Sequence, residues 1–287
     1  MSVIMAVHGD QPFIDEQLAS LAAQTYSGWW EVVIADNCCS PATLARIDRW
    51  MERLPSLRVI DARARTGANF ARNEAARHGV GELLAICDSD DVTEPTWLAA
   101  LCVAAQAADL VGGHLDVALL NSTEVQSWRP SPTAHGLPEG MNFLPYVAGS
   151  NCAIWRDVYD SVGGCDEDLI GGGGGDDVDL SWRVQLAGGR IAFAADAVVH
   201  YRLRPDLRSL WDQMGSYGVS AARLYKKFRS SGAQRADALT ALKIWVRLVQ
   251  RAPGALRSST RRGHWLREVA YLLGRLRGAV RYRVVYW

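Results

Sequence analysis

The sequence predicts an α/β fold, a mostly parallel sheet flanked by helices, followed by a basic helical extension. Two observations lead to this prediction. Short apolar runs alternate with amphipathic segments over residues 3–107, which is the pattern of strands and helices that build a parallel sheet. Beyond residue 205, apolar residues recur at helical spacing with arginines between them. A chain of 287 residues is long enough for one large domain with an appendage.

The individual elements follow one another in order along the first 107 residues. The strands are short apolar runs, and the helices carry apolar residues on one face, such as Leu18 and Leu21 in the first. We expect strands at residues 3–7, 31–35, 57–60 and 83–87, and helices at residues 15–24, 41–54, 69–77 and 96–107. The first strand is not followed by GxGxxG, and GxxxxGK[ST] is absent, which disfavours a standard dinucleotide fold and a P-loop enzyme.

The sequence Asp-Ser-Asp-Asp at residues 88–91 is the most informative motif. It directly follows the strand expected at 83–87, and open α/β sheets bind their ligands at the carboxyl ends of strands. Charges about 4 Å apart repel by roughly 4 kcal/mol near a protein surface, so a cation would relieve this cluster. Oxygen ligands of this kind suit Mg²⁺ or Mn²⁺, usually shared with substrate phosphates. A solvated acidic turn that caps the next helix is the alternative interpretation.

A second acidic cluster, Asp176, Asp177 and Asp179, follows a run of five glycines at residues 171–175. We expect a helix that begins with these acids, because the positive end of the helix dipole favours them. Arg183 lies four residues after Asp179 and is expected to pair with it on the helix face. The glycines favour a loop with close backbone packing over a flexible linker.

Charge is divided unevenly along the chain. Residues 1–200 contain 12 Arg and 27 Asp or Glu, a formal charge of −15, whereas residues 201–287 contain 19 Lys or Arg and 4 Asp or Glu, a charge of +15. An acidic body and a basic tail indicate two different partners. The N-terminus lacks a signal-peptide pattern, no apolar run reaches the roughly 18–20 residues of a membrane span, and the six cysteines lack zinc-site spacing. We expect a cytoplasmic protein with reduced cysteines.

The basic tail is predicted to be helical. Two sets of apolar residues recur at helical spacing: Leu239, Leu242, Trp245 and Val249 in the first, and Trp265, Val269, Leu272, Leu276 and Val280 in the second. Such stripes are typical of packing against a core or a second helix. Because arginine and tryptophan are abundant, a helix that lies on the inner face of a membrane is the other interpretation.

Several motifs together resemble one family. They lie at residues 6–8, 36, 65–73, 88–91, 149–153, 162–167, 175–180 and 198–200. Their order and spacing are similar to those of the GT-A inverting glycosyltransferases of family 2, over roughly residues 2–205. The resemblance implies a Rossmann-like GT-A domain at 1–205 that binds a nucleotide sugar and carries out catalysis. Residues 206–287 form the basic helical extension outside it.

The resemblance also implies roles for individual residues. The donor-binding residues would be Val7, Asp36, Arg65, Arg72, Asp88 and Ser89. Asp177 would be the catalytic base, and Asp90 and His200 would be ligands of Mn²⁺ or Mg²⁺. The acceptor-side or supporting residues would be Asp91, Asn151, Asp176 and Trp182. In this scheme Asp36 binds the nucleotide base and Asp88 the ribose. For single residues the plain structural interpretations remain, a turn residue for Asp36 and a strand-end histidine for His200.

This chain departs from the usual family pattern in three places. Asp176-Asp177 stands where Glu-Asp is usual, His8-Gly9 stands where Tyr-Asn is frequent, and the five-glycine loop is unusual. A base that works near neutral pH needs a raised pKa, and we expect burial and the adjacent Asp176 to raise that of Asp177.

The predicted function is metal-assisted, inverting transfer of a sugar from a nucleotide-diphosphate donor, with UDP favoured, to an acceptor hydroxyl. The acceptor could be a glycan, a lipid-linked glycan, a protein or a small molecule, and the basic tail favours contact with a membrane. A nucleotide- or nucleic-acid-binding module is an alternative, although the tail lacks a nucleic-acid motif. A related nucleotidyltransferase is another, although residues 9–11 are acidic where a basic Gly-rich loop would be expected.

Overall fold

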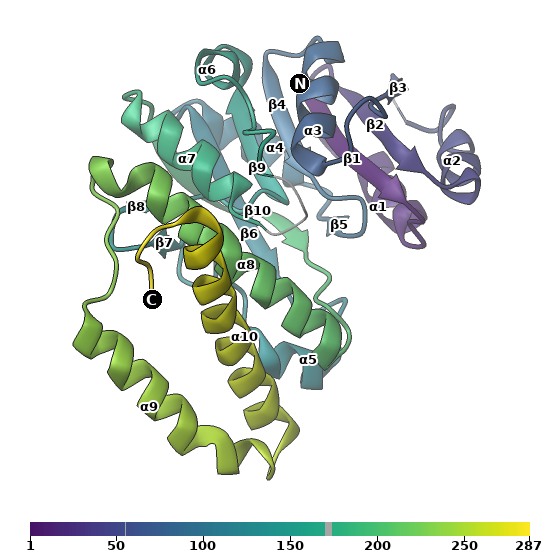
Figure 1. Ribbon diagram of the computed structural model, residues 1–287. Coiled ribbons are helices and arrows are strands. Elements are labelled where there is room, and N and C mark those ends of the chain that lie inside the picture. The colour runs from purple at the N-terminus through teal and green to yellow at the C-terminus, as the bar shows by residue number, and fades with distance from the viewer. Residues whose placement is uncertain (55, 170–173) are drawn as a thin grey trace.

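A computed structural model describes residues 1–54, 56–169 and 174–287 (Figure 1). The prediction for the five-glycine loop therefore falls largely on residues 171–173, which lie outside the described residues. The two glycines that follow, Gly174 and Gly175, have φ of 66° and 89°. These angles favour glycine because a side chain is strained there.

One eight-stranded sheet forms the centre of the protein, in the order β3-β2-β1-β4-β9-β6-β10-β5. Its strands are β1 (Ser2–Gly9), β2 (Glu31–Cys39), β3 (Leu57–Asp61), β4 (Leu83–Cys87), β5 (Val92–Thr93), β6 (Leu110–Asp116), β9 (Asn151–Trp155) and β10 (Ile191–His200); β7 (Glu139–Gly140) and β8 (Leu144–Pro145) form a separate hairpin. The pairs β1–β2, β2–β3, β1–β4 and β6–β10 are parallel. The predicted α/β fold with a mostly parallel sheet is confirmed, and the antiparallel pairs involve β9 and β5.

Helices cover both faces of the sheet. In chain order they are α1 (Ile14–Ala22), α2 (Pro41–Asp48), α3 (Ala68–His78), α4 (Trp97–Ala105), α5 (Thr123–Trp128), α6 (Arg156–Ser161), α7 (Asp176–Leu186), α8 (Leu207–Phe228), α9 (Ala238–Ala255) and α10 (Ser259–Tyr282). Leu18 and Leu98, from α1 and α4, belong to the core on one face. Ala71 and Leu180, from α3 and α7, belong to the core on the other.

The helix expected at 41–54 is shorter than predicted. It begins at Pro41, where the Ser40 side chain accepts the amide of Thr43, and it ends at Asp48. The next three amides bond carbonyls three residues back, so the chain tightens into turns over residues 49–51. Trp50 then donates to Asp15 of α1 over 2.8 Å, which holds the turn against the neighbouring helix.

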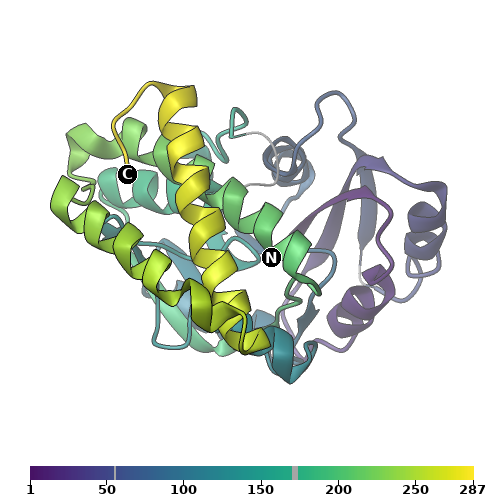
Figure 2. The same ribbon diagram turned by 60° about the horizontal axis from the view of Figure 1, so that its bottom comes forward.

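The C-terminal helices α8 and α10 lie side by side (Figures 1 and 2). The predicted helix around residues 265–280 is present as α10, but Leu276 and Val280 are exposed. Leu272 of the predicted stripe is buried, and the buried face also contains small residues such as Gly274 and Gly278. A Cβ at Gly274 would overlap the backbone of Gly215 in α8, so the two helices meet through glycine at backbone distance. The packing interpretation therefore holds for α10, with a buried face that overlaps the predicted stripe at Leu272.

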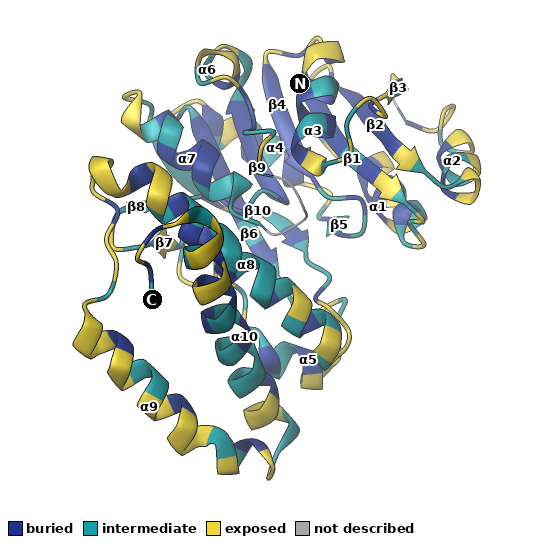
Figure 3. Ribbon diagram, in the orientation of Figure 1, coloured by how far each residue is buried: buried dark blue, intermediate teal, exposed yellow. Residues whose placement is uncertain are grey.

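Helix α9 lies at the periphery of the molecule, and most of its surface is exposed (Figure 3). Ala241, Leu248 and Ala255 are buried on its inner face, and the Trp265 indole of α10 donates to the Leu248 carbonyl over 2.8 Å. Leu242 and Val249, at 59% and 72% exposure, lie on the outer side. Among the described residues, no helix is long and apolar enough to cross a bilayer.

Candidate active site

A cavity of about 820 Å³ lies beyond the carboxyl ends of β1 and β4. Its walls come from the loop after β4, from α3 and α7, and from the C-terminal helices α8 and α10. Seven of the predicted site residues line it: Arg72, Asp88, Ser89, Asp90, Asp176, Asp177 and Trp182. Two acidic segments separated by almost 90 residues of sequence therefore face the same space.

Arg72 joins the two acidic segments. Its Nη2 donates to Asp88 Oδ1 over 2.9 Å, and its Nη1 forms an ion pair with Asp176 Oδ2. Burial opposes the charged form of Arg72, but the carboxylates of Asp176 and Asp88 hold its pKa well above the usual value. The guanidinium stays charged and fixes the loop after β4 against the start of α7.

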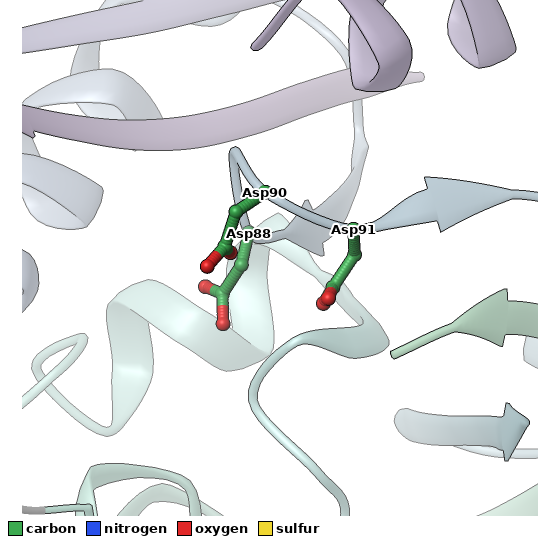
Figure 4. Close-up of side chains that lie close together, drawn as sticks. All are labelled: Asp88, Asp90 and Asp91. Atoms are coloured by element: carbon green, nitrogen blue, oxygen red, sulfur yellow. The ribbon is translucent and has the colours of Figure 1, made fainter. Parts of the chain in front are cut away.

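The carboxylates of Asp88, Asp90 and Asp91 form a group suited to a divalent cation. One oxygen from each lies within 4.8 Å of the others, and Figure 4 shows the three carboxylates on the same side of the loop. Asp91 Oδ2 is buried and has no hydrogen-bond partner among the described residues. Burial, together with the negative charges of its neighbours, raises the pKa of Asp90 and of Asp91. Clustered hard oxygens with an unsatisfied lone pair fit Mg²⁺ or Mn²⁺.

Asp177 lies at the start of α7 and faces the cavity. Its Oδ1 accepts the amide of Val178 over 2.8 Å, and its Oδ2 accepts the amide of Gly149 over 3.2 Å. Burial and then the negative charge of Asp176 raise the pKa of Asp177 to about 6. A carboxylate with this pKa can accept a proton near neutral pH.

Three predicted donor-binding residues do not line the cavity. Val7 is buried in the core, while its neighbours Ala6 and His8 line the cavity from alternate positions of β1. Asp36 lies within β2 and accepts the amide of Cys39 over 2.8 Å. Arg65 pairs with Glu167 at 3.2 Å and with Asp168 at 2.9 Å, so it ties a neighbouring loop to the start of α3.

Asn151, another predicted site residue, is held by hydrogen bonds in the core. Every polar atom of the Asn151 side chain is used: Oδ1 accepts from Trp97 over 2.8 Å, and Nδ2 donates to the carbonyls of His114 and Ala197. Asn151 is fully buried and links β9 to α4, β6 and β10, which does not fit an acceptor-side role.

His200 does not join the acidic group that could hold a metal. Its Nε2 bonds Glu94 and its Nδ1 bonds Asp116, each over 2.7 Å. Because both ring nitrogens are engaged by carboxylates at the end of β10, the predicted role as a metal ligand does not fit this geometry.

Trp182 lines the cavity but is held by the core. Its indole donates to the Leu144 carbonyl over 2.8 Å, and its ring meets Phe143 and Phe228 edge to face. Trp182 therefore packs α7 against the end of α8. The predicted pair of Asp179 and Arg183 is confirmed, with 2.7 Å between Asp179 Oδ2 and Arg183 Nε.

The sequence analysis missed several cavity residues. They are Arg129, Arg204 and the tyrosines Tyr146, Tyr201, Tyr217, Tyr271 and Tyr286. One signal was available: Arg129 is the only Lys or Arg in the turn-rich segment 121–148. The tyrosines come from separate loops and helices, and no local pattern connects them.

Curated proteins with similar sequences include glycosyltransferases. The succinoglycan biosynthesis protein ExoM of Rhizobium meliloti is 26% identical over 196 residues, covering 66% of this chain and 63% of the relative. The pre-mycofactocin glycosyltransferase of Mycobacterium tuberculosis is 29% identical over 193 residues, covering 63% of this chain and 39% of the relative. The chain thus matches less than two thirds of the length of either relative.

Solved structures share the fold. The mannosyltransferase PcManGT of Pyrobaculum calidifontis, in complex with GDP-Man and Mn²⁺, is 20% identical, with 96% of this chain and 86% of that chain covered and a TM-score of 0.64. S. aureus TarS 1-349, in complex with UDP-GlcNAc, is 16% identical, with coverages of 100% and 93% and a TM-score of 0.56. The likeness shows the fold, and this fold is GT-A. The family model described as "Glycosyl transferase family 2" matches residues 2–163, more than half of the chain, so the protein belongs to glycosyl transferase family 2.

Proposed function

We propose that this protein is an inverting glycosyltransferase that moves a sugar from a nucleotide-diphosphate donor, with UDP expected, to an acceptor hydroxyl. One observation carries the proposal: the acidic segments around Asp90 and Asp177 line the same cavity. Transfer with inversion requires a base on one side of the sugar and charge stabilisation on the other. The family and the fold support the same activity.

The donor is proposed to bind at the Asp88 end of the cavity. Asp88 and Ser89 would contact the ribose side of the nucleotide, and Arg72 would hold Asp88 in place through their 2.9 Å bond. Asp88, Asp90 and Asp91 would hold Mn²⁺ or Mg²⁺, which supplies positive charge next to the departing diphosphate.

Asp177 is proposed as the general base. Its carboxylate takes the proton of the acceptor hydroxyl while that oxygen forms a bond to the anomeric carbon. The bond from the anomeric carbon to the diphosphate oxygen breaks, and the nucleoside diphosphate leaves with the electron pair. The amides of Gly149 and Val178 orient the carboxylate throughout.

The proposal is tested by release of free nucleoside diphosphate from UDP-sugars in the presence of Mn²⁺. Asp90→Ala and Asp177→Asn should each lower the rate by at least about 100-fold, the order of loss for one catalytic group. EDTA should abolish release from the wild type. Asp48→Ala, at an exposed site on α2, is the matched control and should keep full activity.

The products separate the competing classes of function. A binding module would release no nucleoside diphosphate, and a nucleotidyltransferase would release pyrophosphate instead. Wild-type activity that survives EDTA, or unchanged activity of Asp177→Asn, would remove the corresponding part of the proposal.

We also propose peripheral contact with a membrane through α9. Its exposed apolar residues, Leu239, Leu242, Val246 and Val249, and Leu256 directly after it, lie next to the exposed cations Lys243, Arg247 and Arg251. An apolar stripe bordered by cations is typical of helices that lie in the interface of an anionic bilayer. Such contact would favour a lipid-linked acceptor over a free glycan or a small molecule.

A further inference from the structure

The segment that follows β10 contacts the acidic loop after β4 through a single residue, Arg202. Its backbone amide donates to Asp91 Oδ1 over 2.7 Å. Its side chain, through Nε, donates to the carbonyl oxygen of Asp90 over 2.8 Å. One arginine thus bonds two consecutive aspartates of the loop.

The same guanidinium also contacts the start of α1. Its Nη2 donates to Glu16 Oε2 over 2.8 Å, and its central carbon lies 3.7 Å from the ring centroid of Phe13. A cation held over an aromatic face is attracted by the ring. The Arg202 side chain is 18% exposed. The loop after β4, the end of β10 and the start of α1 therefore meet at this side chain.

Helix α1 also bonds the far side of the acidic loop. The amide of Thr93 donates to Ser20 Oγ over 3.0 Å, and Gln24 Nε2 donates to the carbonyl oxygen of Glu94 over 2.8 Å. The loop is thus fastened to α1 on both sides. On the side of Asp90, the fastening is the side chain of Arg202.

The acidic loop requires such support because its charges repel one another. One carboxylate oxygen from each of Asp88, Asp90 and Asp91 lies within 4.8 Å of the others. Arg72 holds Asp88 through a 2.9 Å bond. The amide of Arg202 occupies Asp91 Oδ1, and Asp91 Oδ2 is buried without a hydrogen-bond partner among the described residues. This arrangement leaves Oδ2 available to a cation.

We propose that Arg202 is a positioning residue of the metal site. Its guanidinium holds the backbone at Asp90 against the start of α1, and so sets where the carboxylates of Asp90 and Asp91 stand for a divalent cation. The sequence predicted a metal ligand, His200, at this end of β10, whereas the residue that contacts the acidic loop is Arg202. This inference rests on the proposed function, since it concerns the cation of the same reaction.

The charge of Arg202 and its hydrogen bonds have opposite effects on a bound cation. A positive charge beside the acidic loop repels Mn²⁺, so its removal should by itself strengthen binding. Loss of the bonds that fix the loop should weaken binding, because groups that orient metal ligands commonly decide how tightly the metal binds. The direction of the change in affinity therefore distinguishes positioning from charge.

The test measures Mn²⁺ binding to the full chain by electron paramagnetic resonance, which detects the free ion. Wild type and variants are titrated at one fixed concentration of UDP, because substrate phosphates usually share the cation. A titration of UDP without protein gives the Mn²⁺ that the nucleotide binds by itself. Thermal unfolding of each variant shows that it is folded at the temperature of the titration.

Two substitutions of Arg202 separate its hydrogen bond from its charge. Arg202→Met removes the charge and every donor, and should weaken Mn²⁺ binding by about 10- to 100-fold. Arg202→Gln removes the same charge, but its amide nitrogen can occupy the place of Nε and donate to Asp90. It should therefore bind Mn²⁺ about 3- to 10-fold more tightly than Arg202→Met.

A third variant and a control complete the set. Glu16→Gln removes the partner of Nη2 at a half-exposed site, where folding is preserved, and should weaken Mn²⁺ binding by about 2- to 5-fold. Arg183→Met is the matched control: Arg183 is 19% exposed and bonds Asp179 and the carbonyl oxygen of Gly164, each over 2.7 Å. It should lower the melting temperature and leave Mn²⁺ affinity unchanged.

The outcomes separate this inference from the proposed function. If the wild type binds no Mn²⁺ beyond that bound by UDP alone, the metal part of the proposed function fails, and this inference fails with it. If the wild type binds Mn²⁺ but Arg202→Met binds it equally well or more tightly, only the positioning role is overturned. Should Arg202→Met not fold, unchanged affinity in both Arg202→Gln and Glu16→Gln overturns it in the same way.

Discussion

Asp177 owes its chemistry to its surroundings. An aspartate in water would be ionised at any pH above about 4 and would be a weak base. Here burial and the charge of Asp176 raise the pKa to about 6, while two backbone amides hold the carboxylate at the cavity wall. Arg72 limits the effect by pairing with Asp176.

The first prediction concerns the pH dependence of turnover. Because the base must be ionised, kcat/KM should fall tenfold per pH unit below about 6. Asp176→Asn removes the neighbouring negative charge and should move this limb to lower pH. A pH–rate profile from pH 4.5 to 8 with Mn²⁺ and a UDP-sugar measures both. A limb that stays in place in Asp176→Asn would contradict the assigned cause.

The second prediction concerns folding stability: ionisation of Asp177, which activity requires, should lower it. Because the pKa of Asp177 is raised on folding, its contribution to stability is largest below pH 4 and is lost as the pH rises through about 6. Thermal unfolding at pH 8 should therefore show Asp177→Asn to be at least as stable as the wild type. This result would exclude misfolding as the cause of its lost activity.

At the residue scale, the sequence predicted the acidic side chains of the cavity better than it predicted the others. Asp88, Asp90 and Asp177 follow a strand or begin a helix, positions from which a side chain reaches the sheet edge. Asn151 and His200 have residue types as suitable for a site, but their partners come from distant strands. Only the tertiary structure shows that those partners use up their polar atoms.

The contact between the helices α8 and α10 depends on glycine. A Cβ at Gly218 would overlap the carbonyl oxygen of Tyr271, whereas a Cβ at Gly215 would meet its nearest atom, the carbonyl oxygen of Ala270, at an ordinary 3.8 Å. Both glycines lie in the same helix. The pair therefore separates the effect of close packing from that of helix propensity.

The third prediction uses this pair. Gly218→Ala should destabilise the protein by about 1–3 kcal/mol, because the helices must move apart. Gly215→Ala should be neutral or stabilise it by up to about 1 kcal/mol, because alanine favours the helix. Urea unfolding of both variants measures the difference. Equal stabilities would show that the two helices do not meet at backbone distance.

The sequence predicted the elements with local patterns well. The strand at 83–87 agrees with β4, and the helix at 69–77 falls within α3. The antiparallel insertion of β9 between β4 and β6 was not predicted, because its pairing joins residues about 70 positions apart. The glycine contact was missed for a related reason: small residues carry no hydrophobic signal, and so the apolar stripe of α10 indicated only part of its buried face.

The uneven charge of the whole molecule bears on where it works. The basic third of the chain contains α8, α9 and α10, and α9 exposes an apolar outer face. Burying one Leu or Val side chain in a bilayer contributes about 1.5–3 kcal/mol, and each cation near an anionic leaflet about 1 kcal/mol. A few such residues are enough to hold a protein at a membrane surface.

The fourth prediction follows from this surface. Wild-type protein should cosediment with vesicles containing anionic lipid, and raised salt should weaken the binding. Val249→Asp should reduce binding at least about 10-fold, since it places a negative charge in the apolar stripe. Val103→Asp is the matched control, because Val103 on α4 is exposed to a similar extent, 67% against 72%. Equal loss in both variants, or no wild-type binding, would refute the role of α9.

The two walls of the cavity come from different stretches of the polypeptide. Residues before 201 contribute the aspartates, and α8, α10 and Tyr286 contribute further parts of the lining. Shuffling tails between homologues should therefore alter which molecule receives the sugar and leave the choice of nucleotide intact. In a protein truncated after residue 205, water would reach the cavity beside Asp177. We expect such a protein to hydrolyse the nucleotide sugar instead of transferring its sugar to an acceptor.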